Sequence, residues 1–212
     1  MCAEVVEMNG AGIMLMAGDI PQGSLCSTDQ VSAFIEESLF ALGEGPCVDA
    51  YRLDRPVLEP DLANAATPRW MAFTGPVLEV GVRAIFGFPL RVGGVRLGAL
   101  NLYRDRPGAL TADQHADALA MADIATRAVL VMQSNAPLGQ IAVELSTGAD
   151  FEYVVHQASG MVAAQLDVSV GQALIRLRAY AFGNARPLRA VAEDVVARRL
   201  RLDCGSEKDP TP

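Results

Sequence analysis

The chain has 212 residues, of which 51% are hydrophobic and 6% aromatic, and its formal net charge is -8. This length fits one large domain or a medium and a small one, and the apolar content excludes a disordered chain. The sequence has no uncharged apolar run of about 18 residues, which argues against a membrane span, and its four cysteines lack CxxC spacing, which argues against a zinc site or a disulfide framework and favours a cytoplasmic protein.

The N-terminal part predicts two strands followed by a helix. Residues 10–18, GAGIMLMAG, are an apolar run bounded by glycines and are typical of a buried strand. Ser24–Ser27 predicts a second strand after a turn at Pro21–Gly23. Thr28 and Asp29 are both suitable N-caps for a helix over residues 31–42. The apolar face of that helix is predicted to contain Val31, Phe34, Ile35, Ser38, Leu39 and Leu42.

The middle of the chain predicts a loop and then a β-hairpin. Residues 43–50, GEGPCVDA, are rich in glycine and proline and predict a loop, and residues 55–62 are expected to be extended because prolines set their backbone. In residues 82–103, two β-rich runs flank the pair Gly93–Gly94, which is favoured in tight hairpin turns.

The hairpin is followed by four predicted helices. Thr111 and Gln114 form a capping box for a helix over 112–133. Pro137 and Gly139 indicate a hinged connector over 134–150. Three shorter helices are predicted beyond it, over 151–166, from Ser169, and over 187–201, and residues 203–212 are predicted to be a disordered tail. The second of these helices is expected to bury Val170. The expected core of the three-helix bundle also contains Ala158, Ala173, Leu177, Ala181, Leu188, Val191 and Ala192.

The charge is divided along the chain at the same boundary. Residues 1–149 hold 9 arginines and 17 acids, a net -8, whereas residues 151–202 hold 7 arginines against 4 acids, a net +3. A basic segment is therefore joined to an acidic one. Arginine grips phosphate through a planar fork and stacks on bases, so the basic segment is a candidate for binding nucleic acid.

Residues 154–200 contain three motifs, Gln157-Ala158-x-Gly160, Ala173-x-x-x-Leu177-Arg178-x-x-Ala181, and Arg186-Pro187-Leu188-x-x-Val191-Ala192. With these motifs the segment resembles an ANTAR domain of the actinobacterial type. The resemblance implies an all-α, three-helix domain that binds paired RNA hairpins, as a dimer, and prevents a transcription terminator from forming.

The upstream region is characterised by residues 43–57, the neighbourhood of Trp70, residues 81–110 and the alanine-rich helix after them. On these segments, residues 9–133 resemble a GAF domain, which often accompanies an ANTAR domain. The resemblance implies an α/β (α+β) sensory domain with an antiparallel sheet over residues 1–133. Such domains usually begin with a helix before the first strand, and we expect that helix to be short or missing here.

The resemblance and the charge together suggest RNA-binding residues in the C-terminal module. They are Arg176, Arg178, Tyr180, Arg186, Arg189, Arg198, Arg199 and Arg201. Arg189 with Glu193, and Asp194 with Arg198, have i,i+4 spacing, so these charges either pair on a solvated helix face or contact RNA. Arg178 lies beside Leu177 and either fixes helix packing or binds phosphate. Tyr180 either stacks on an unpaired base or is a half-buried surface aromatic.

The GAF-like domain could enclose a small-molecule pocket lined by Cys47, Trp70, Phe73 or Phe86. The sequence does not name the ligand, and it predicts no cofactor and no metal. The expected function is a non-enzymatic antitermination regulator that binds RNA as a homodimer, without membrane or duplex DNA. One alternative is a ligand-sensing homodimer whose C-terminal bundle mediates protein–protein interaction. Another is a redox sensor or enzyme that uses Cys47 in an exposed loop.

Overall fold

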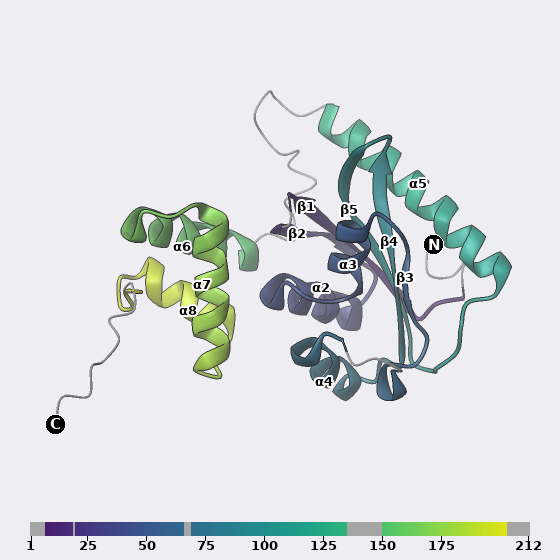
Figure 1. Ribbon diagram of the computed structural model, residues 1–212, viewed down its shortest axis with the longest axis horizontal. Coiled ribbons are helices and arrows are strands. Elements are labelled where there is room, and N and C mark those ends of the chain that lie inside the picture. The colour runs from purple at the N-terminus through teal and green to yellow at the C-terminus, as the bar shows by residue number, and fades with distance from the viewer. Residues whose placement is uncertain (1–6, 19, 66–68, 135–149, 203–212) are drawn as a thin grey trace. The chain divides into compact units, whose positions relative to one another are not determined.

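The structure is a computed structural model that describes residues 7–18, 20–65, 69–134 and 150–202. The chain divides into two compact units, Met1–Ala149 and Asp150–Pro212. The first contains a β-sheet with helices and the second is helical (Figure 1). The stretch before the first strand, where the helix was expected to be short or missing, lies largely outside the described residues, and so does the connector over 134–150. The tail over 203–212 lies outside them. In the described ranges no helix has the length and apolarity needed to cross a lipid bilayer.

The first unit is built on a five-stranded antiparallel sheet with the strand order β2-β1-β5-β4-β3. The strands are β1 (Gly10–Ala17), β2 (Ile20–Ser27), β3 (Val57–Glu59), β4 (Ala84–Val92) and β5 (Val95–Arg104). The predicted hairpin is confirmed, and Gly93 at its turn has φ 55°, a left-handed backbone that glycine adopts without strain. The antiparallel α/β fold expected for this unit is therefore present.

Strand β2 begins earlier than the sequence predicted. Pro21–Gly23 lies inside the strand and is not a turn, because the chain has already reversed after Gly18, where φ is 56°. The pairing of β2 with β1 shifts register twice, between Ile13 and Met14 and again between Leu15 and Met16. These shifts accommodate a proline in a strand that has only one neighbour.

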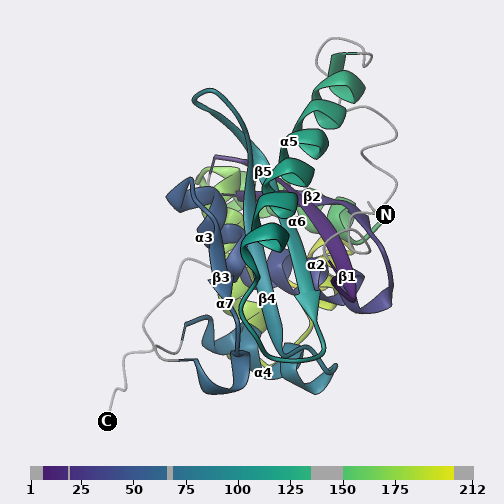
Figure 2. The ribbon, with the colours of Figure 1, turned by 90° about the vertical axis from the view of Figure 1, so that its right-hand side faces the viewer.

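Helices cover both faces of this sheet (Figures 1 and 2). Three lie on one face: α2 (Gln30–Leu42), α3 (Pro46–Leu53) and α4 (Met71–Glu79), with the short 3-10 helix η1 (Leu62–Asn64) before α4. The long helix α5 (Ala112–Ser134) covers the other face. It packs through alanines at 118, 122 and 125 against Phe86, Phe88, Leu90, Leu100 and Leu102 of the sheet. Its predicted capping box is confirmed, with two hydrogen bonds of 3.1 Å between Thr111 and Gln114.

Helix α2 was predicted correctly, although its buried face is rotated. The Asp29 carboxylate accepts a hydrogen bond of 2.8 Å from the Ser32 N–H, and the Ser32 hydroxyl accepts one of 3.0 Å from the Asp29 N–H. The buried residues are Ser32, Ile35, Glu36, Leu39 and Phe40, so the predicted positions Val31, Phe34, Ser38 and Leu42 are only half-buried. The apolar pattern did not reveal this rotation because a serine and a glutamate are buried.

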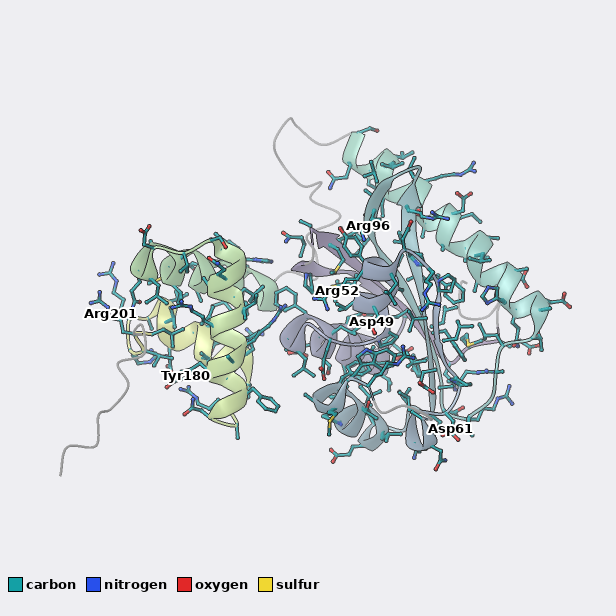
Figure 3. All side chains as sticks on the ribbon, viewed as in Figure 1. Asp49, Arg52, Asp61, Arg96, Tyr180 and Arg201 are labelled. Atoms are coloured by element: carbon teal, nitrogen blue, oxygen red, sulfur yellow. The ribbon has the colours of Figure 1, made fainter. Side chains whose placement is uncertain are left out.

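The predicted loop over residues 43–50 is confirmed for residues 43–45 and wrong beyond them, because helix α3 begins at Pro46. Proline fits the first helical position, where its missing N–H costs nothing, and Gly45 precedes it with φ 134°. The far end of α3 is also capped: Arg96, from β5, donates 3.0 Å hydrogen bonds to the carbonyl oxygens of Tyr51 and Arg52. Figure 3 labels Arg96 and Arg52. A cation at a helix C-terminus is favourable, so this contact holds the hairpin to α3.

The second unit contains the three predicted helices, α6 (Asp150–Leu166), α7 (Val170–Gly183) and α8 (Leu188–Val196). The capping box that opens α7 is present, between Ser169 and Gln172. The seven expected core residues, Ala158, Ala173, Leu177, Ala181, Leu188, Val191 and Ala192, are all buried.

Two expectations for the second unit are wrong. Val170 was expected in the core but is 52% exposed. The last helix ends at Val196 and not at residue 201, because Arg198 adopts a left-handed backbone with φ 59° and the N–H groups of Arg199 and Leu200 turn back to the carbonyl of Asp194. No glycine lies at this end, so the usual sequence signal for a helix C-terminus is absent.

Candidate functional site

The first unit contains a cavity of about 290 Å³ between β3, η1 and α4. Its apolar lining includes Leu62 and Leu78, and its polar lining includes Glu59 and Arg69, with the ring of Trp70 beside them. The Arg69 guanidinium lies 4.7 Å from the centroid of the Trp70 ring. Its Nη2 lies 3.7 Å from Oε2 of Glu59. A carboxylate, a cation and an aromatic ring therefore meet at one apolar cavity.

The backbone around Trp70 is held in place from two sides. The indole Nε1 donates a 2.9 Å hydrogen bond to Oδ2 of Asp49 on α3; Figure 3 labels Asp49. The Glu44 carboxylate accepts hydrogen bonds of 2.9 and 3.1 Å from the N–H groups of Ala72 and Phe73 and so caps α4 from a distant loop. These contacts compensate for the left-handed backbone of Trp70, φ 54°, which is uncommon for a bulky residue.

A second polar group is buried where α2 and α3 pack on the sheet. Glu36, 1% exposed, accepts a 2.7 Å hydrogen bond from Nδ2 of Asn101 on β5. Glu36 fits there because Gly12 on β1 carries no side chain. Cys47 is 1% exposed, and its burial, together with the nearby charge of Glu36, raises the pKa of the thiol well above its usual value. A thiol in this setting is protonated and shielded, unlike a reactive one.

The four residues suggested for a sensor pocket do not line one cavity. Trp70 lines the 290 Å³ cavity, whereas Phe86 lines a separate open depression of about 560 Å³ beside His115. Phe86 packs in the core under α5, and the next residue, Gly87, faces α3 on the opposite side of the sheet, because successive residues of a strand point to opposite faces. Cys47, on α3, and Phe73, on α4, are buried and line neither of these two cavities.

In the second unit, several of the suggested RNA-binding arginines are paired with acids. Asp194 is held by two arginines: its Oδ2 lies 2.6 Å from Arg186 and its Oδ1 lies 2.8 Å from Arg199. These two hydrogen bonds lower the pKa of the Asp194 carboxyl. The Arg186 pKa is raised, first by the Asp194 hydrogen bond and further by Tyr180. Arg186 and Arg199, both suggested as RNA-binding residues, therefore pair with an acid that the sequence did not indicate, because neither has i,i+4 spacing to Asp194.

One of the two ion pairs suggested by i,i+4 spacing is present. Arg189 and Glu193 pair at 2.9 Å, as the spacing suggested. Asp194 does not pair with Arg198, because Arg198 lies beyond the end of α8 and Asp194 is already occupied. Arg198 and Arg201 instead line an open cavity of about 550 Å³ together with Met161, Gln165, Val195 and Leu200. In the described part of the chain neither arginine forms an ion pair.

Helix α7 presents apolar side chains to solvent. Ile175 is 63% exposed and Phe182 is 71% exposed, and Ala179 lies between them on the same face. Arg176 is exposed on this helix, whereas Arg178 and Tyr180 are half-buried. Figure 3 labels Tyr180 on α7 and Arg201 after α8. Phe182 is therefore the aromatic side chain of this helix that is exposed enough to stack on a base. It was not among the residues predicted to bind RNA.

Comparison with known families decides the identity of the first unit. A GAF domain profile matches residues 1–130, more than half of the chain. The chain belongs to the GAF domain family. No curated protein sequence matches it significantly.

The first unit is also similar to solved structures. A domain of a two-component sensor histidine kinase from Sinorhizobium meliloti superposes with a TM-score of 0.52 at 17% identity, over 63% of this chain and 86% of that one. The GAF region of a membrane protein from Geobacter sulfurreducens gives 0.47 at 14% identity, over 58% and 82%. A free methionine-R-sulfoxide reductase from Thermoplasma acidophilum gives 0.44 at 19% identity, over 59% and 84%. At these identities the first of the three likenesses shows a shared fold.

The cavity of the GAF domain was only partly foreseen. Trp70 was suggested, but Glu59 and Arg69 were missed because β3 and the start of α4 are far enough apart in sequence that no local pattern joins them. The available signal was Glu59 itself, a carboxylate in an otherwise extended apolar segment. In the residues that the structure describes, no three histidine, cysteine or acidic side chains gather to hold a metal ion.

Proposed function

We propose that this chain is a non-enzymatic signalling regulator in which the GAF domain controls a C-terminal ANTAR-type unit that binds hairpin RNA and prevents transcription termination. The GAF domain supplies the sensory part, as in signal-transduction proteins. The RNA-binding part is supported by the ANTAR motifs of residues 154–200 and by the local net charge of +3. We further propose that it acts as a homodimer.

The observation that carries the RNA proposal is the cavity lined by Arg198 and Arg201. Both guanidinium groups are exposed and have no acidic partner in the described residues, so they are available to phosphate. The apolar side chains of Met161 and Leu200 in the same cavity offer a surface for an unstacked base. Arg186, Arg189 and Arg199 are held by acids and contribute less.

Binding of the full chain to RNA tests this proposal. RNAs that carry two hairpins with randomised loops are selected on the protein, and the affinity of the enriched RNA is measured across salt concentrations. The double variant Arg198→Ala/Arg201→Ala is expected to lose about tenfold in affinity and to lower the salt slope by roughly 1–2, because each arginine–phosphate contact releases counterions. The control is Arg189→Ala, which removes an exposed arginine that is paired with Glu193. If no RNA is enriched, or the double variant binds as the wild type does, the proposal is wrong.

The exposed apolar face of α7 favours a second candidate, in which the C-terminal unit mediates protein–protein interaction. Exposed residues at 175, 179 and 182 repeat at helical spacing and suit a partner helix. The variant Ile175→Ser/Phe182→Ser is expected to abolish self-association measured by sedimentation while leaving RNA affinity within twofold, if this face is the interface. Loss of RNA binding with unchanged association would instead assign Phe182 to base stacking.

A further inference from the structure

Among the residues that the structure describes, the Glu59 carboxylate at the 290 Å³ cavity of the GAF domain has no strong partner. Glu59 is 9% exposed. No N–H or O–H group of the described residues donates a hydrogen bond to its side chain, and its one ion contact is the 3.7 Å approach of Arg69, which is longer than a hydrogen bond. A largely buried carboxylate is costly unless donors satisfy it. The site can therefore accept one or two charge-assisted hydrogen bonds from an incoming molecule.

Arg69 is suited to be displaced. Its side chain is 41% exposed, so its guanidinium can move into water at little cost. That guanidinium approaches both the Glu59 carboxylate and the face of the Trp70 ring. It occupies the position that any other cation attracted by the same two groups would take.

The rest of the cavity fits the hydrocarbon part of a small molecule. Leu62, Leu78 and Ala63 line it, and its volume is near the lower end of the range of about 300–1,000 Å³ that small-molecule sites occupy. A carboxylate and an aromatic face beside apolar walls select a cation with an apolar body. An anion would be repelled by Glu59, which is the more deeply buried of the two charged residues.

We propose that this cavity binds a small organic cation, an ammonium or guanidinium group on an apolar body, which displaces Arg69 from Glu59 and Trp70. This inference names the class of ligand that the proposed sensory domain would detect, and it rests on that proposed function. Binding at the cavity can be measured without RNA, so the two proposals fail separately.

Trp70 is the single tryptophan of the chain, and its fluorescence therefore reports directly on this cavity. The full-length protein is titrated with 2-phenylethylamine, and with 2-phenylethanol and phenylacetate as the uncharged and anionic molecules of similar shape. The amine is expected to change the fluorescence saturably, and the alcohol and the acid are expected to bind at least tenfold more weakly or not at all.

Two variants are expected to act in opposite directions. Glu59→Gln keeps the size of the side chain and removes its charge, so amine binding should be lost. Arg69→Gln removes the competing cation, so the amine should bind about threefold to tenfold more tightly. The matched control is Arg91→Gln. Arg91 lies on the hairpin, outside the cavity lining, and forms an exposed ion pair with Asp54.

The sign of the Arg69→Gln effect distinguishes this proposal from a structural role for the pair. Weaker amine binding in Arg69→Gln, stronger binding of phenylacetate than of the amine, or no amine binding by either the wild type or Arg69→Gln would overturn it. Thermal unfolding followed by Trp70 fluorescence shows that each variant is folded. If Glu59→Gln does not fold, the comparison of amine and alcohol binding in the wild type and in Arg69→Gln still tests the proposal.

Discussion

Gly87 is the point at which strand β4 passes closest to the start of helix α3. A Cβ built there would lie 2.6 Å from the carbonyl oxygen of Pro46 and 3.1 Å from the nitrogen of Cys47. Both neighbours are backbone atoms, so no side chain can rotate away, and helix α3 would have to withdraw from the sheet. We expect Gly87→Ala to cost about 1–3 kcal/mol, the usual cost of overpacking a core. In a domain of this size that lowers the melting temperature by about 3–10 °C.

Thermal unfolding followed by tryptophan fluorescence measures this effect in the GAF domain alone, because Trp70 is the single tryptophan and belongs to that unit. The control is Gly94→Ala in the hairpin turn, where an added Cβ would meet no atom within 4 Å. Equal melting temperatures for the wild type and Gly87→Ala would refute the close approach of β4 and α3.

Three further predictions follow from single contacts. Leu177→Ala, at a fully buried position of the C-terminal unit, should lower that unit's free energy of unfolding by about 2–5 kcal/mol. It should remove the helical circular dichroism that this unit contributes without changing the Trp70 transition. Ile175→Ala, at a position that is 63% exposed, should change neither signal. Burial raises the Asp29 pKa, but hydrogen bonds, led by the Ser32 N–H, outweigh it and lower that pKa below the ordinary value, so the stabilisation from this N-cap is complete above about pH 4 and is lost as the pH falls through the lower folded value. Asp29→Ala should therefore cost about 1 kcal/mol at neutral pH and nothing in strong acid, measured by urea unfolding. Cys47, in a variant whose other cysteines are serine, should react with a thiol reagent only after unfolding, and rapid labelling of the native protein would revive the redox-sensor alternative.

The elements that the sequence predicted well are those defined by local signals. The hairpin of β4 and β5 follows from two β-rich runs around Gly93–Gly94, and α5 and α7 follow from capping boxes and a helical repeat of small apolar residues. Helix α3 was missed because a glycine-rich start with a proline is typical of loops, although proline is also favoured at the first helical position. Helix α4 was missed because its cap, Glu44, is distant in sequence and Pro76 interrupts its pattern.

The candidate sites were less predictable because their contacts are not local. Asp194 pairs with Arg186 from the turn before α8 and with Arg199 after it, and neither spacing is the i,i+4 of a regular helix. The end of α8 at a left-handed arginine was equally hidden. Among the residues suggested for a sensor pocket, Phe86 points to the face of the sheet that α5 covers, whereas Cys47 lies on α3 at the other face. Selecting such residues one at a time from the sequence did not show on which face of the sheet each would lie.

The two edges of the GAF sheet limit how another protein can attach to it. One edge strand, β3, has only three residues, and the other, β2, contains Pro21 and pairs irregularly with β1. Short, interrupted edges are poor templates for strand addition, and natural proteins use them to avoid aggregation. A partner or a second copy would therefore engage this domain through the surfaces of its helices and loops, and the sheet is protected from extending into fibrils.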